Sequence, residues 1–107
     1  MAGARIELVV PADEPALFFA SIAQAERYLE PIDVKNGVIG VAFGRLGEPY
    51  RVSDGGDAVV IEAVSDQPDQ PERLRAVLVA FLFAIGEPPS EADDLNTLLA
   101  RCELYCE

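Results

Sequence analysis

Residues 76–86 (AVLVAFLFAIG) place the strongest constraint on the fold, because they form an apolar run without a polar or charged side chain. A membrane span needs about 20 such residues, so this shorter run predicts a helix of the protein core. The helix predicted over residues 72–85 is apolar nearly all round beyond Arg75, and such a helix must be covered on more than one side. The rest of the chain has to supply a sheet, a second helix or another copy of the protein to cover it.

Five short segments predict the sheet. Strands are expected where apolar or β-branched runs end at turn residues, over residues 5–10, 15–19, 38–43, 50–53 and 58–64. Their spacing from residue 38 onward indicates an antiparallel meander, and the last strand, whose only charge is Glu62, is expected near the centre of the sheet. The order β(β)αβββαα predicts one α+β domain over residues 1–107, with helices packed on an antiparallel sheet and two helices at the C-terminal end.

Capping patterns predict where the helices begin. Ser21, Asp69 and Ser90 each stand three residues before a glutamine or an acidic residue, which is the arrangement of a capping box. The last of these opens a helix expected over residues 90–104, which supplies a second cover for the apolar helix. Pro31 disfavours helical geometry at the residue before it, so the first helix is expected to end there. The chain is then expected to pass through the turn at residues 36–37 into a strand.

The charge balance limits the partners. The chain has 19 acidic and 8 basic residues, no histidine and a net charge of −11. Such a surface repels phosphate backbones and anionic membranes, so neither nucleic acid nor a membrane is expected as a partner, whereas a basic protein is attracted quickly. The simpler alternative is that the acidity only keeps the protein soluble. Glu7 interrupts the early apolar run, so no secretory signal is predicted and a cytoplasmic location is expected.

No enzymatic chemistry, cofactor or metal site is predicted. The chain lacks histidine, its serines are explained as helix caps or strand ends, and no glycine-rich loop has phosphate-binding spacing. Asp54 and Asp57 bring only two carboxylates to a turn, whereas calcium takes about six to eight oxygen ligands. Cys102 and Cys106 share a helix face but have no second pair of ligands, so buried thiols are expected rather than half of a metal site.

The candidate binding residues are mostly acidic, and several also have a structural explanation at the start of a helix, where the helix dipole favours negative charge. Together they are expected to combine into an acidic rim that contacts a partner: Asp54, Asp57, Asp66, Asp69, Glu72, Glu87, Glu91, Asp93 and Asp94. Exposed charge pairs add little each, so a partner also needs apolar or aromatic anchors. Tyr50 and Tyr105 are candidates for that role, with a position at the edge of the core as the alternative.

Residues 17–37 (LFFASIAQAERYLEPIDVKNG) combine an apolar LFF strand, the Ser21 cap, the sequence YLEPIDV and an Asn-Gly turn. This segment resembles small bacterial immunity proteins of polymorphic and contact-dependent toxin systems. The resemblance implies a small, acidic, non-enzymatic cytoplasmic protein that binds and neutralises a cognate toxin domain, commonly a basic nuclease. In such a complex, carboxylates stand in for substrate phosphates and pair with the lysines and arginines of the toxin.

Two alternatives come from other classes of protein. The chain is a self-associating structural or regulatory domain if residues 73–85 form a homodimer interface. It is a small-molecule binding module if a pocket lies between the sheet and that helix, although the sequence names no convergent polar groups for one.

Overall fold

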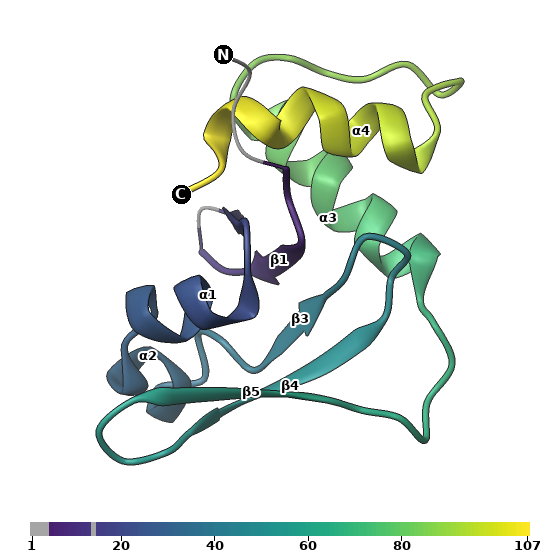
Figure 1. Cartoon of the computed structure of the whole chain (residues 1–107). Helices are drawn as coiled ribbons and strands as arrows, with labels where there is room; N and C mark the ends of the chain where they lie inside the picture. Colours follow the sequence, from purple (N-terminus) through teal and green to yellow (C-terminus); the bar gives the residue numbers. More distant parts are fainter. Residues whose placement is uncertain (1–4, 14) are drawn as a thin grey trace.

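The structure is a computed structural model that describes residues 5–13 and 15–107, and it has the predicted α+β architecture (Figure 1). The strands are β1 (Leu8–Pro11), β2 (Ala16–Phe19), β3 (Val41–Phe43), β4 (Pro49–Asp54) and β5 (Val59–Ala63). The helices are α1 (Ile22–Tyr28), α2 (Pro31–Lys35), α3 (Pro71–Ala84) and α4 (Leu95–Cys102), and a 3-10 turn, η1 (Glu103–Tyr105), follows. The predicted class, its antiparallel sheet and its two C-terminal helices are confirmed.

The sheet has the order β2-β1-β3-β4-β5, and every neighbouring pair is antiparallel. The β4–β5 hairpin is the longest pairing, from Tyr50↔Ala63 to Asp54↔Val59. The prediction that the last strand lies at the centre was wrong, because β5 is an edge strand. Its buried residues lie on one face: Val59 and Ile61 are buried, whereas Val60 is half-buried and Glu62 exposed on the other. The sequence of β5 therefore reflects a strand with one face packed on the core and the other face exposed.

Helices cover the sheet on both faces, with a hydrophobic cluster under each pair. Val9 and Phe43 face α3 and α4, which contribute the buried residues Leu74, Leu78, Phe81, Leu82, Leu98, Leu99 and Cys102. Leu8 and Val10 face the other way and pack with residues of α1, β4 and β5, among them Ala25, Leu29, Val52, Val59 and Ile61. The prediction that the sheet and the last helix both cover the apolar helix is confirmed.

Each outer edge of the sheet has a hydrogen-bond partner. At β2 the C-terminal segment runs alongside, and Glu107 N donates to Phe18 O at 2.8 Å. At β5 the side chain of Glu26, from α1, accepts a hydrogen bond from Ile61 N at 2.9 Å. Free strand edges are templates for pairing with another chain, so these contacts disfavour association by strand addition.

The first helix begins as predicted but is followed by a second helix rather than by a strand. The hydroxyl of Ser21 accepts a hydrogen bond from Gln24 N at 3.0 Å, so the predicted cap is formed. Helix α1 ends at Tyr28, and Pro31 then opens α2 at its first position, where the missing N–H costs nothing. The sequence did not predict α2, and the strand expected over residues 38–43 begins only at Val41.

The two C-terminal helices begin later than, or differently from, their predicted caps. Helix α3 has Gln70 at its N-cap with no side-chain cap, so the predicted Asp69 cap is not formed. Helix α4 is capped by Asp94, whose carboxylate accepts from Thr97 N at 2.8 Å, rather than by Ser90. The carbonyl of Asp93, which a longer helix would use internally, instead accepts a hydrogen bond from the Arg75 guanidinium. Tertiary contacts therefore hold this segment as a loop.

Candidate partner-binding surface

The structure places the candidate acidic residues in two parts of the chain. Glu87, Glu91, Asp93 and Asp94 lie in the loop between α3 and α4, at the top of Figure 1. Asp54 ends β4 and Asp57 lies in the β4–β5 turn, towards the bottom of Figure 1. Asp66 and Asp69 lie on the segment that joins β5 to α3, and Glu72 lies in the first turn of α3. The two groups approach each other where Arg75, one turn after Glu72, donates a hydrogen bond to the carbonyl of Asp93. They differ in their internal contacts and are therefore described separately.

Three of the four candidate carboxylates in the α3–α4 loop are used within the protein, and only that of Glu91 makes no described bond. Glu87 accepts a hydrogen bond from the hydroxyl of Tyr105 at 2.6 Å, and this bond raises the pKa of that tyrosine. The carboxylate of Asp93 accepts from Ser90 N at 3.0 Å and forms an ion pair with Arg101 at 3.4 Å. Hydrogen bonds from Thr97 hold the pKa of the Asp94 carboxyl below its ordinary value. These acids hold the loop and the start of α4, which explains their presence without a partner.

The acids along β5 are not used in this way. Asp57, Glu62, Asp66, Asp69 and Glu72 are all exposed, and their carboxylates make no hydrogen bond or ion pair within residues 5–13 and 15–107. We call these five residues the β5 acidic strip. At about 3.3 Å per residue, the nine steps from Asp57 to Asp66 span at most about 30 Å. The strip therefore presents a row of unpaired negative charge along one edge of the sheet.

For Asp54 and Glu62, the structure differs from the sequence prediction about which acids are available to a partner. Asp54 was a candidate, but its carboxylate lies 3.5 Å from the Lys35 ammonium and accepts from Gly56 N at 2.8 Å, which stabilises the β4–β5 turn. Glu62 was not a candidate, and its strand was expected near the centre of the sheet. A charged residue alternating with buried apolar neighbours is the signal that could have identified it as an exposed acid.

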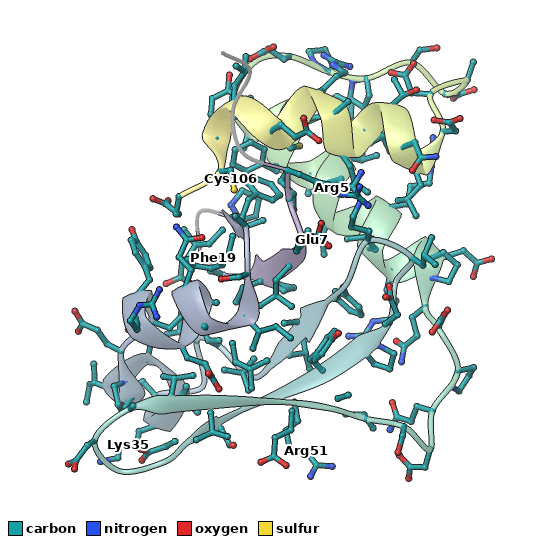
Figure 2. The ribbon with its side chains drawn as sticks, in the orientation of Figure 1. Arg5, Glu7, Phe19, Lys35, Arg51 and Cys106 are labelled. Atoms are coloured by element: carbon teal, nitrogen blue, oxygen red, sulfur yellow. The ribbon has the colours of Figure 1, made fainter. Side chains whose placement is uncertain are left out.

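The sheet face beside the strip is open. The register places Val41, Arg51 and Glu62 opposite one another on one face, with Ser53 and Val60 next to them. Val41 is 39% exposed, and the Arg51 side chain points away from α1 and α2 in Figure 2. Ala42, Val52 and Ile61 are buried on the other face, beneath α1. An apolar pair of valines therefore adjoins the acidic strip on a surface that no described helix covers.

The two candidate tyrosine anchors lie at the edge of the core. Tyr50 is half-buried and packs against the hydrophobic cluster under α1. The Tyr105 ring makes an edge-to-face contact with Phe81, with 5.4 Å between ring centroids, and its hydroxyl bonds to Glu87. Both rings have structural contacts, and neither stands out as a free anchor.

The described residues give little support for reactive chemistry at the two thiols. Burial raises the pKa of Cys102 to about 11 and also raises the pKa of Cys106, so both thiols are protonated near neutral pH. No group of three or more cysteine or acidic side chains in residues 5–13 and 15–107 is arranged to hold a metal ion. None of the helices in that part of the chain has both the length and the apolar character to cross a membrane.

Comparison with protein-family models, with curated proteins and with solved structures finds no significant match. The fold and the surface define a small acidic α+β domain with an open sheet face. Its role has to be argued from its own residues.

Proposed function

We propose that the protein is a non-enzymatic acidic inhibitor that binds a basic partner domain through the β5 acidic strip and the adjoining open sheet face. The observation that carries this proposal is a contrast: Glu87, Asp93 and Asp94 of the loop have internal partners, whereas the strip acids have none among the described residues. Neighbouring like charges repel one another, so an unpaired row of carboxylates does not favour the folded protein by itself. A surface rich in lysine and arginine would turn that repulsion into attraction.

The strip is suited to accelerating association more than to supplying affinity. Exposed ion pairs are worth about 0.2–1 kcal/mol each and are screened by salt. Affinity then has to come from apolar contact near the centre of the interface. Val41 and Val60 supply apolar area beside Glu62, and the bond from Ile61 N to Glu26 disfavours strand addition at the edge. The partner is therefore expected to dock on the open face and strip rather than to extend the sheet.

The nature of the partner follows from the resemblance of residues 17–37 to immunity proteins. On that basis the partner is a cognate toxin domain, commonly a basic nuclease, and the protein neutralises it in the cytoplasm. The strip carboxylates would occupy the positions of substrate phosphates and pair with the basic side chains that bind them. A row of up to about 30 Å is long enough to contact several such side chains at once.

A tagged pull-down from the source cells at low salt, followed by a salt wash and mass spectrometry, tests this proposal. A single basic protein with a nuclease-like domain, retained in stoichiometric amount and released by salt, is the expected result. Purified protein should then inhibit that nuclease at equimolar concentration. No partner in either wash, together with a stable dimer of the purified protein, would contradict the proposal and favour self-association through α3, where Phe83 is 61% exposed.

A further inference from the structure

A small pocket lies between the N-terminal end of α3 and the sheet. It has a volume of about 150 Å³, and its walls come from β3, from β4 and from the segment that joins β5 to α3. Phe43 and Val64 give it apolar walls, and Arg51, Arg73 and Gln67 bring polar groups to it. In a chain with 19 acidic residues, no acidic side chain lines this pocket.

The Arg73 guanidinium is oriented without a carboxylate. It lies 5.3 Å from the centroid of the Phe43 ring, and its Nη1 donates to the side-chain oxygen of Gln70 at 2.7 Å. The Gln70 amide in turn donates to the side-chain oxygen of Gln67 at 3.4 Å. Both glutamine oxygens are therefore already accepting hydrogen bonds. The remaining N–H groups of Arg73 and Gln67, which are exposed, are donors available to an acceptor that enters the pocket.

Arg51 is a second basic residue in the lining of the same pocket. No acidic side chain among the described residues lies within 4.0 Å of its nitrogens, although Glu62 is opposite it in the strand register. Four other basic residues have such a partner: Arg5, Lys35, Arg45 and Arg101. The positive end of the α3 dipole lies at the same place, because Gln70, the N-cap residue of α3, lines the pocket. Its side chain does not cap the helix. All these features favour a negatively charged ligand.

We propose that this pocket binds the carboxylate of a small apolar acid. A guanidinium offers paired donors that match the two oxygens of a carboxylate, and two arginines are among the residues that line the pocket. The Phe43 ring and Val64 suit an apolar body of limited size, because a cavity of about 150 Å³ is large enough for a benzene molecule. The pocket shares Val41 and Arg51 with the open sheet face. It takes an anion, whereas the β5 acidic strip takes basic groups, and its binding can be measured without a protein partner.

Titration of the ¹⁵N-labelled full chain with sodium benzoate, followed by NMR, tests the proposal. Saturable shifts are expected at the signals of Gln67, Gln70 and Arg73, and neutral benzamide should bind about tenfold more weakly because it lacks the charge that strengthens each hydrogen bond. Acetate should also bind more weakly, because it lacks the apolar ring. No saturable shifts at these residues, or benzamide or acetate binding as tightly as benzoate, would overturn the proposal.

Three variants separate the pocket from a general effect of charge. Arg73→Gln and Arg51→Gln should each weaken benzoate binding about tenfold, the loss expected for a charge-assisted hydrogen bond. Arg27→Gln is the matched control, because Arg27 is exposed on α1, has no acidic partner among the described residues and lies outside the pocket. The NMR spectrum of each variant without ligand confirms its fold. An equal loss in Arg27→Gln would mean that only net charge matters and would refute the assigned site.

Discussion

Gly47 lies in the β3–β4 turn and packs against the start of α3. Its replacement by alanine should be strongly destabilising. Its φ is +86°, and a Cβ added there would lie 2.5 Å from Gln70 C and from Pro71 N. The Gly47 carbonyl also accepts a hydrogen bond from Gln70 N at 2.7 Å, so the two backbone segments are held together. The neighbouring atoms belong to the main chain, and they cannot rotate away as a flexible side chain would.

The cost of Gly47→Ala has two parts. Holding a non-glycine residue at positive φ costs about 1–2 kcal/mol. Displacing the α3 start to make room for the methyl group adds about 1–3 kcal/mol, the usual cost of overpacking. The free energy of unfolding should therefore fall by about 2–5 kcal/mol, out of a total of about 5–15 kcal/mol for a domain of this kind.

Two other glycines separate these contributions in urea unfolding followed by circular dichroism. Gly56 has a φ of +97° but no atom within 4 Å of an added Cβ, so Gly56→Ala should cost only the backbone strain of about 1–2 kcal/mol. Gly40 has neither a positive φ nor a close neighbour, so Gly40→Ala should be close to neutral or stabilising by up to about 1 kcal/mol. Equal losses for Gly47→Ala and Gly56→Ala would refute the close contact between the turn and α3.

Three further predictions test other contacts. The pKa of Asp94 is lowered in the folded protein, so its carboxylate stabilises the fold above the ordinary carboxyl pKa, and this effect is lost as the pH falls through the folded-state pKa. Asp94→Ala should therefore lower the melting temperature at pH 7 and progressively less in acid. A loss that does not depend on pH would contradict the cap. Cys102, buried and with a pKa of about 11, should react with a thiol reagent only in denaturant, and rapid labelling of the native protein, located by peptide mapping, would disprove its burial. Glu26→Ala should increase concentration-dependent association in analytical ultracentrifugation because it frees Ile61 N at the β5 edge, unlike Glu30→Ala, which removes an exposed acid without such a bond.

The sequence predicted the features of the fold that depend on local pattern. The apolar run of residues 76–86 indicated a helix that needs two covers, and the sheet and α4 supply them. Ser21 was identified as a cap because its partner, Gln24, lies within one helical turn of it. The strands were found from short apolar runs between turn residues, since that signal is contained in each segment.

The errors arose where contacts between distant segments decide the outcome. Ser90 and Asp93 do form a hydrogen bond, but Arg75 and Arg101 hold their loop, so the helix begins after Asp94. Pro31 was predicted to stop one helix, and the same fixed φ also allows it to begin another. These alternatives have the same local sequence, and only packing distinguishes them.

The candidate surface was predicted in composition but not in organisation. Acidic residues are visible in the sequence, whereas the presence or absence of an internal partner is a property of the folded chain. Asp93 and Asp94 have such partners, and Asp57 and Asp66 have none among the described residues. The pocket arginines were missed for the same reason, because Arg51 and Arg73 come together only when the β5–α3 segment folds back over the sheet.

The most direct test of the central claim is a comparison of partner capture by two triple variants with the same change in charge. The strip variant carries Asp57→Asn, Glu62→Gln and Asp66→Asn, and its control carries Asp13→Asn, Glu30→Gln and Glu91→Gln, exposed acids whose carboxylates make no described hydrogen bond or ion pair. Each variant makes the net charge of −11 less negative by three units. At low salt, the strip variant should lose the basic partner while the control retains it. Equal capture by both, or equal loss from both, would contradict a binding role for the β5 acidic strip.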